Sequence, residues 1–144
     1  MIKTIGRKDR IDLPELGIFD VEAKIDTGAY GCALHCHHIE IIKQDGYDVL
    51  SFQVLDPSHP EFRDKIFYVK NYNQKKVKSS SGVKENRYTI KTNSILFGKT
   101  YRVVFSLTDR KRMKNPILLG RQFLAKRYLV DVTKKDLSFN QKSK

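Results

Sequence analysis

Apolar and polar residues alternate with a period of two in several short stretches of this chain. Between residues 19 and 25, Phe19, Val21, Ala23 and Ile25 are apolar, whereas the intervening residues are Asp, Glu and Lys. The same alternation occurs in 50–54, 88–92 and 101–107, short apolar runs occupy 66–69 and 117–119, and we expect a last strand at 128–132 to close the fold. A period of two is typical of half-buried strands. Because almost no segment has a helical period, the pattern predicts an all-β chain.

Turn residues separate these predicted strands. Asp45-Gly46 marks one turn, Gly98-Lys99 marks a hairpin turn, and residues 56–60 have the composition of a loop. Residues 33–42 are extended in character, and residues 121–126 are long enough for one or two helical turns. Many short strands at close spacing favour a closed barrel with one short C-terminal helix. We expect residues 1–144 to form a single domain, with 136–144 as a loose basic tail.

The chain is strongly basic, with 28 Lys and Arg against 16 Asp and Glu, which gives a formal charge of +12. Such a charge favours acidic partners, namely RNA, the ribosome or an acidic peptide. Few aromatic residues lie among the basic clusters, although binding of single-stranded nucleic acid by stacking needs them.

No apolar run approaches the roughly 18 residues that span a bilayer, and no apolar signal segment follows the basic N-terminus. We therefore expect no membrane contact and a cytoplasmic location. As a separate expectation, the thiols of Cys32 and Cys36 are free.

Asp26-Thr27-Gly28 directly follows the strand predicted at 19–25. An acid, a hydroxyl and a glycine supply a carboxylate, a hydrogen-bonding partner and room for a close backbone approach. These are the groups that an aspartic-peptidase site needs. The same residues are also common in turns after edge strands, so the three residues alone leave both interpretations open.

A second motif supports the first interpretation. The chain contains residues 23–29, Ala-Lys-Ile-Asp-Thr-Gly-Ala, and later residues 117–121, Ile-Leu-Leu-Gly-Arg. This pairing resembles the single-lobe retropepsins. The chain is still more similar to a bacterial and archaeal family of retropepsin-like proteins called ATP-dependent zinc proteases, often encoded beside a glutamate ligase that modifies a ribosomal protein. The likeness extends over 13–17, 33–35, 79–87, 106–113 and 118–132, and it implies a closed retropepsin-like (acid protease) barrel.

The resemblance also implies roles for individual residues. Asp26 would be the catalytic aspartate, and because one lobe supplies one aspartate, two chains would form a homodimer. Residues supporting the active site would be Thr27, Gly28, Ala29, Leu119, Gly120 and Arg121. The chain has Tyr30-Gly31-Cys32 where the family usually has Arg-Thr-Ser. In retropepsins the late arginine commonly pairs with an acid just beyond the D-T-G motif, but no acid occurs between Asp26 and Ile39, so the partner of Arg121 stays open.

The polar and basic stretch 75–87 is a candidate for a flap that covers the substrate. Its centre is Ser79, Ser80, Ser81 and Gly82. An ordinary surface hairpin is the alternative. Together with the positive charge, the family context favours an acidic peptide substrate, such as a polyglutamate extension made by the neighbouring ligase.

The family name invites a search for zinc and ATP sites. His35 and His37 lie two apart on a predicted strand and so face the same side, which makes them weak metal candidates. No His-Glu-x-x-His segment supplies further ligands, and we expect no metal. Gly98-Lys99-Thr100 imitates the end of a phosphate loop, but residue 93 is Asn and no helix is predicted to follow. We expect no cofactor.

Three functions follow from the sequence. The leading one is a homodimeric aspartic peptidase that hydrolyses peptide bonds with a pair of aspartates. The second is a catalytically silent β-barrel binding module that docks on the ribosome or RNA. The third, with the weakest support, is a zinc-dependent hydrolase.

Overall fold

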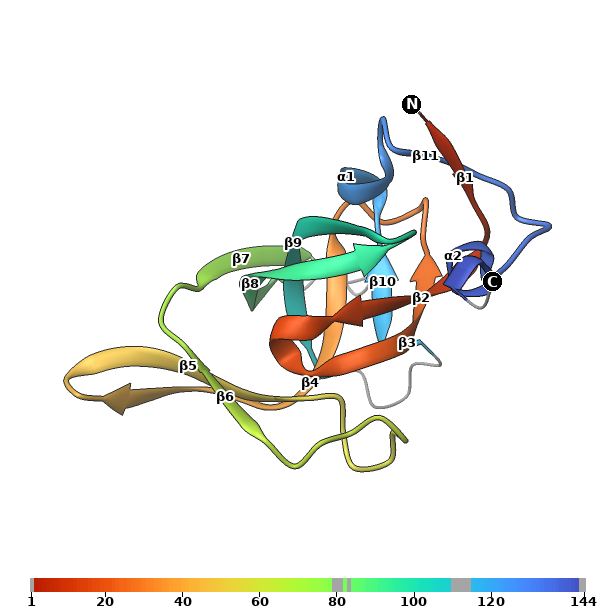
Figure 1. Ribbon diagram of the computed structural model, residues 1–144. Coiled ribbons are helices and arrows are strands. Elements are labelled where there is room, and N and C mark those ends of the chain that lie inside the picture. The colour runs from red at the N-terminus through yellow and green to blue at the C-terminus, as the bar shows by residue number, and fades with distance from the viewer. Residues whose placement is uncertain (1, 79–81, 83, 110–114, 143–144) are drawn as a thin grey trace.

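The protein forms a closed β-barrel, as the sequence predicts (Figure 1). A computed structural model describes residues 2–78, 82, 84–109 and 115–142. Within these residues six strands follow one another around the barrel: β10 (Ile117–Leu119), β3 (Ile18–Ile25), β2 (Lys8–Leu13), β8 (Lys84–Leu96), β9 (Lys99–Thr108) and β4 (Cys32–Gln44). The barrel closes because β10 pairs with β3 on one side and with β4 on the other.

The barrel interior is filled by apolar side chains from alternate strand positions. On β3, Val21, Ala23 and Ile25 are buried while Glu22 and Lys24 are exposed. Fully buried residues from the other strands include Ile11, Leu34, Phe105 and Ile117. These residues form one contiguous core.

The alternation breaks at the start of β3. Phe19 was expected to point inward, but it is 52% exposed and Ile18 is buried instead. Asp20 has a left-handed backbone with φ of 53°, and the pairing of β2 with β3 shifts register between Ile11 and Leu13. Such an irregularity moves the following side chains to the opposite face.

Strand β4 continues beyond the barrel and forms an arm with β5 (Tyr47–Val54) and β6 (Ile66–Val69) (Figure 1). The predicted turn at Asp45-Gly46 joins β4 to β5, with φ values of 52° and 81°. The predicted hairpin around Gly98 joins β8 to β9. A short 3-10 helix, η1 (Pro14–Leu16), lies between β2 and β3.

Parts of the candidate flap stretch 75–87 belong to regular strands. Strand β7 (Asn73–Lys78) pairs antiparallel with β8. The candidate flap residues Ser79, Ser80 and Ser81 lie outside the described residues, and Gly82 has a positive φ of 84°.

The two ends of the chain depart from the prediction. Strand β11 (Tyr128–Val130) does not complete the barrel but pairs in parallel with β1 (Lys3–Ile5) in a separate small sheet. The helix predicted after Gly120 is confirmed as α1 (Arg121–Leu124). No helix among the described residues is long and apolar enough to cross a bilayer.

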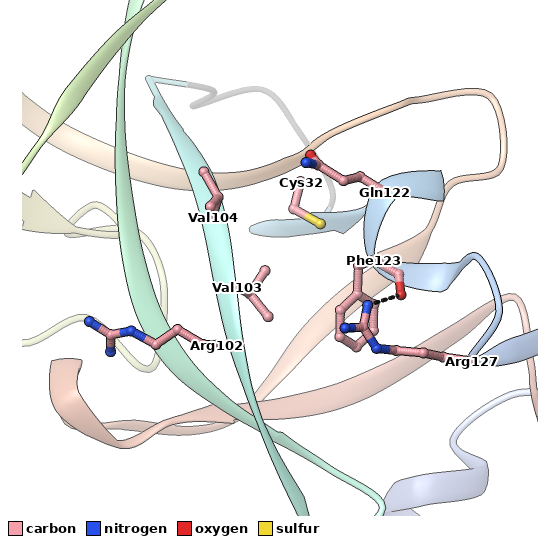
Figure 2. A pocket seen from close by; sticks show the side chains of 7 residues that line it. All are labelled: Cys32, Arg102, Val103, Val104, Gln122, Phe123 and Arg127. Carbon is pink, nitrogen blue, oxygen red and sulfur yellow. Dashed lines mark hydrogen bonds between the residues drawn. The ribbon is translucent and has the colours of Figure 1, made fainter. Parts of the chain in front are cut away.

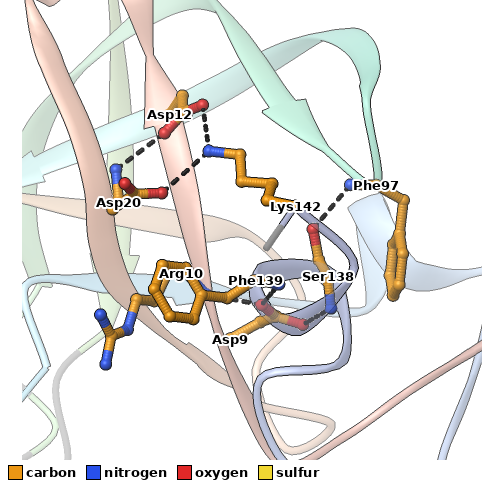
Figure 3. A network of polar contacts seen from close by, with 8 residues as sticks. All are labelled: Asp9, Arg10, Asp12, Asp20, Phe97, Ser138, Phe139 and Lys142. Atoms are coloured by element: carbon orange, nitrogen blue, oxygen red, sulfur yellow. Dashed lines mark hydrogen bonds and ion pairs between the residues drawn. The ribbon is translucent and has the colours of Figure 1, made fainter. Parts of the chain in front are cut away.

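The expected loose tail at 136–144 is wrong over most of its length, because residues 137–142 form helix α2 (Leu137–Lys142) against β2 (Figure 3). The buried carboxylate of Asp9 accepts hydrogen bonds from the backbone N–H groups of Ser138 and Phe139. Lys142 forms ion pairs with Asp12 and Asp20 at 2.7 and 2.8 Å. Residues 143 and 144 lie outside the described part of the chain.

Candidate active site

Strands β3 and β10 bring the two sequence motifs together. They run in parallel, with Ile25 opposite Leu119, so Asp26 and Gly120 leave the sheet at the same level. The backbone N–H of Asp26 donates a hydrogen bond to the carbonyl oxygen of Leu119, at 2.9 Å. The D-T-G motif and the late glycine are therefore neighbours.

The Asp26 carboxylate is half-buried at the start of a tight loop. Its Oδ1 accepts a hydrogen bond from the backbone N–H of Gly28 at 3.0 Å, and the carbonyl oxygen of Asp26 accepts one from Ala29 at 3.2 Å. The side chain of Thr27 is exposed beside it. The loop thus fixes the orientation of the carboxylate through its own backbone while leaving it accessible.

Gly120 allows this loop to pack against the start of α1. A Cβ atom at Gly120 would lie 2.2 Å from the carbonyl oxygen of Gly31 and within 2.8 Å of those of Tyr30 and Ala29. The carbonyl oxygens of Ala29 and Tyr30 accept hydrogen bonds from the N–H groups of Arg121 and Gln122, at 2.8 and 2.7 Å. Loop carbonyls therefore satisfy donors in the first turn of the helix, which has no earlier turn to bond with.

The side chain of Arg121 binds the Asp26 loop through its backbone. Its Nη1 donates a hydrogen bond to the carbonyl oxygen of Thr27 at 2.9 Å. Its guanidinium carbon also lies 5.9 Å from the centre of the Tyr30 ring, which is 59% exposed. The partner that the sequence left open is therefore a backbone carbonyl.

Cys32 follows this loop at the start of β4 and lines a small cavity of about 190 Å³ with Val103, Phe123 and Arg127 (Figure 2). Burial raises the pKa of the Cys32 thiol, while a hydrogen bond from the Gly120 backbone opposes the rise. Burial also raises the pKa of the Cys36 thiol. Both cysteines are free, and at neutral pH both stay protonated, so neither is an activated nucleophile.

A larger cavity of about 360 Å³ separates the Asp26 loop from the β7–β8 hairpin. Residues 29–33 and Leu118 line one side, and Lys75, Lys76 and Arg87 line the other. The ammonium nitrogen of Lys75 lies 6.0 Å from the centre of the Tyr30 ring. The strands that flank the candidate flap therefore stand beside the candidate active site.

His35 has a different role from metal binding. It is buried, with Nε2 2.5 Å from Asp56 Oδ2 and Nδ1 3.2 Å from the carbonyl oxygen of Thr108. Both ring nitrogens face oxygen atoms of the protein, which occupy the positions that a metal ion would need. Hydrogen bonds from Ser58 and from His35 lower the pKa of Asp56 to about 2. Sequence reasoning missed this pair because 21 residues separate its members along the chain.

His37 does not join His35 in a metal site. It is half-buried and stacks on the ring of His38, with the ring centres 3.8 Å apart. In the part of the chain that the structure describes, no three His, Cys, Asp or Glu side chains are grouped to hold a metal ion.

Comparisons with curated proteins find relatives named probable alpha-L-glutamate ligases. The one from Desulfotalea psychrophila is 32% identical over 133 residues, which cover 90% of this chain and 28% of the relative. The one from Parasynechococcus marenigrum is 30% identical over 131 residues, covering 88% of this chain and 27% of the relative. The chain therefore spans little more than a quarter of the length of these relatives.

The fold and the family agree with the site geometry. A crystal structure of a Legionella pneumophila protein of unknown function superposes with a TM-score of 0.74 at 28% identity, covering 94% of this chain and 98% of that one. The model of the RimB-like family, described as retropepsin-like aspartic endopeptidase RimB, matches residues 4–141. Because that match includes both Asp26 and Gly120, this chain belongs to the RimB-like family of retropepsin-like aspartic endopeptidases.

Proposed function

We propose that the protein is an aspartic peptidase that works as a homodimer, with Asp26 of each subunit forming the catalytic pair. The observation that carries this proposal is the placement of Asp26 at the end of β3. There its backbone is bonded to Leu119, and its carboxylate is oriented by the N–H of Gly28 yet accessible. Membership of the RimB-like family supports the same reaction.

The requirement for two chains follows from the chemistry. Two carboxylates about 3 Å apart cannot both ionise, so they share one proton and titrate as a unit. Asp26 is the only acid between Glu22 and Glu40, so its own loop offers no second carboxylate. A two-fold axis beside the loop would supply the second Asp26 from an identical subunit. The exposed Thr27 would then brace the pair across that axis.

The proposed reaction needs only water and this pair. The ionised carboxylate takes a proton from a water molecule whose oxygen attacks the peptide carbonyl carbon, while the protonated carboxyl gives its proton to the carbonyl oxygen. In the breakdown of this tetrahedral intermediate, the carboxyl that took the water proton gives it to the amide nitrogen as the carbon–nitrogen bond breaks, and a hydroxyl of the intermediate returns its proton to the other carboxylate. The carboxyl product then forms, and the pair again holds one proton.

An acidic peptide is the proposed substrate. The formal charge of +12 attracts anionic chains, and three basic side chains line the cavity beside the Asp26 loop. The curated relatives are named for ligation of alpha-L-glutamate, and each contains a region similar to this chain. A ligase that adds glutamate produces an acidic extension. Such an extension is a suitable substrate for a basic peptidase region within the same polypeptide.

The catalytic proposal is tested by replacing Asp26 and by measuring assembly. Asp26→Asn is nearly isosteric but cannot share a proton as a carboxylate pair does, so cleavage of glutamate-rich peptides should fall at least 1,000-fold, as for loss of an essential catalytic group (about 10³ or more). Sedimentation at several concentrations should show a dimer in both variants. A chain that stays monomeric at high micromolar concentration but cleaves with full activity would refute the shared site.

A binding module that docks on the ribosome or RNA is the second candidate, because the same positive charge favours phosphates. It predicts salt-dependent RNA binding that Asp26→Asn leaves unchanged. Such binding, combined with no peptide cleavage by the unmodified chain, would favour the module over the peptidase.

A further inference from the structure

We propose that Lys75 and Arg87 form a carboxylate-binding subsite that selects an acidic side chain of the substrate. This inference rests on the proposed peptidase function and assigns its specificity to two residues. Neither residue belongs to the D-T-G motif or to the late glycine motif. Both lie on the β7–β8 hairpin, on the side of the cavity that faces the Asp26 loop.

The pairing of β7 with β8 places the two cations side by side. Lys75 is directly opposite Arg87 in the antiparallel register, so both side chains leave the same face of the hairpin. Directly opposed like charges destabilise a pair of strands. A substrate carboxylate placed between them would interact with both charges.

The surroundings of Lys75 leave it available for a ligand. Its side chain is exposed, and among the side chains that the structure describes no carboxylate forms an ion pair with it. Its Nζ lies 3.5 Å from where a Cβ on Gly31 would stand. The ammonium group therefore reaches across the cavity to the Tyr30-Gly31 backbone, only a few residues after Asp26.

The cavity has the chemistry that a glutamate side chain requires. Its volume of about 360 Å³ is in the range of ligand pockets (about 300–1,000 Å³). Ala33 and Leu118 supply apolar surface for methylene groups, while Lys75 and Arg87 supply the charges. A guanidinium can hold a carboxylate with two parallel hydrogen bonds, and an ammonium adds a point charge.

The test measures peptide binding without cleavage. All variants carry Asp26→Asn, and the probes are a fluorescent six-glutamate peptide and its six-glutamine counterpart, followed by anisotropy. Adding Lys75→Gln and Arg87→Gln should weaken binding of the glutamate peptide at least tenfold, because a hydrogen bond to a charged group contributes about a factor of ten. Binding of the glutamine peptide should change less than about twofold by comparison, since it carries no charge to lose.

Lys91→Gln is the matched control, because Lys91 is an exposed lysine of β8 that lines a different cavity. It removes one positive charge without touching the proposed subsite and should leave both affinities unchanged. An equal loss from Lys91→Gln, or no loss from the double variant, would overturn the proposal because affinity would then reflect overall charge. A thermal melt of each variant verifies that the barrel is folded.

Cleavage assays with Asp26 intact separate the two proposals. Peptide binding that depends on Lys75 and Arg87, without any cleavage, would refute the peptidase and support the subsite. Cleavage of glutamate and glutamine peptides at equal rates, in the parent and in the double variant, would refute the subsite and support the peptidase.

Discussion

Arg121 holds the backbone of Thr27, since its Nη1 donates a hydrogen bond to the Thr27 carbonyl oxygen at 2.9 Å. The resemblance to retropepsins implied an acidic partner, but no acid follows Asp26 in the loop. The Thr27 carbonyl oxygen accepts the arginine donor instead, so the residue after the late glycine holds the residue after Asp26. The contact is exposed and therefore contributes little to stability.

Arg121→Ala should lower peptidase activity much more than stability. Without the clamp the Asp26 loop shifts, and misplacement by about 1 Å can cost about 100-fold in rate. We expect kcat/KM to fall about 10- to 100-fold. The free energy of unfolding should fall by less than about 1 kcal/mol. Peptide cleavage and urea unfolding measure the two effects.

Arg102→Ala is the control for this prediction. Arg102 lies on β9 and forms an exposed ion pair with Glu15 at 2.7 Å. Its loss should have a similarly small effect on stability and none on cleavage. Equal activity losses in the two variants would argue against a clamp at Arg121.

Gly120→Ala should unfold the site, whereas Gly28→Ala should disturb only its chemistry. A Cβ at Gly120 would collide with three backbone carbonyl oxygens of the loop between β3 and β4, at 2.2 to 2.8 Å. We expect a loss of about 3 kcal/mol or more in the free energy of unfolding, as for other overpacked positions. A Cβ at Gly28 would meet only Asp26 Oδ1, at 3.3 Å.

Gly28→Ala should therefore keep the unfolding free energy within about 1 kcal/mol of the parent while reducing cleavage. Circular dichroism during urea titration gives the stabilities, and peptide assays give the rates. A Gly120→Ala variant as stable as Gly28→Ala would contradict the close packing of the loop on α1.

The strands were predictable because they depend on local pattern. Val21, Ala23 and Ile25 alternate with charged residues, and this alternation alone places Asp26 at the end of a half-buried strand. The late motif and the D-T-G motif could be paired only through the family resemblance. Their contact depends on the parallel register of β3 with β10, which no local pattern specifies.

Features formed by distant residues escaped prediction. The composition of 136–144 is typical of a loose tail, and helix α2 forms there because Asp9, about 130 residues earlier, accepts its first N–H groups. His35 was a metal candidate by spacing, but the loop after β5 folds back and provides Asp56 as its partner. In both cases a long-range polar contact overrides the local tendency.

Asp56→Asn should destabilise the protein at neutral pH and less in acid. Hydrogen bonds from Ser58 and His35 lower the Asp56 pKa from 3.8 to about 2. Because the folded-state pKa is the lower one, the ionised carboxylate stabilises the fold above about pH 4, and this contribution disappears as the pH falls towards 2. At pH 7 we expect a loss of about 2 kcal/mol, the size of a hydrogen bond to a charged group.

Urea unfolding at pH 7, 4 and 3 checks this dependence, since the difference between parent and variant should narrow at each step. Asp48→Asn is the control. Asp48 pairs with Lys43 on the exposed arm at 2.8 Å and should contribute less than about 1 kcal/mol at any pH. A difference that is constant from pH 7 to 3 would show that the carboxylate charge of Asp56 does not stabilise the fold.

Asp9→Ala should release helix α2 from the barrel (Figure 3). The buried Asp9 carboxylate accepts hydrogen bonds from the N–H groups of Arg10, Ser138 and Phe139 at 2.8 to 3.1 Å. Alanine leaves these donors without their acceptor, and loss of a helix-capping side chain costs up to about 2 kcal/mol. Hydrogen exchange at Ser138 and Phe139 should then accelerate by at least tenfold, because about 1.4 kcal/mol corresponds to a factor of ten.

Asp20→Asn provides the comparison, because it removes one of the two acids paired with Lys142 and leaves the Asp9 contacts intact. Asparagine tolerates the positive φ of residue 20, so the backbone there is not strained. Exchange at Ser138 and Phe139 should change less than about threefold, as expected for an exposed ion pair worth under about 1 kcal/mol. If the Ser138 and Phe139 amides exchange at the same rate in both variants, the helix is held by the packing of its side chains and not by the Asp9 carboxylate.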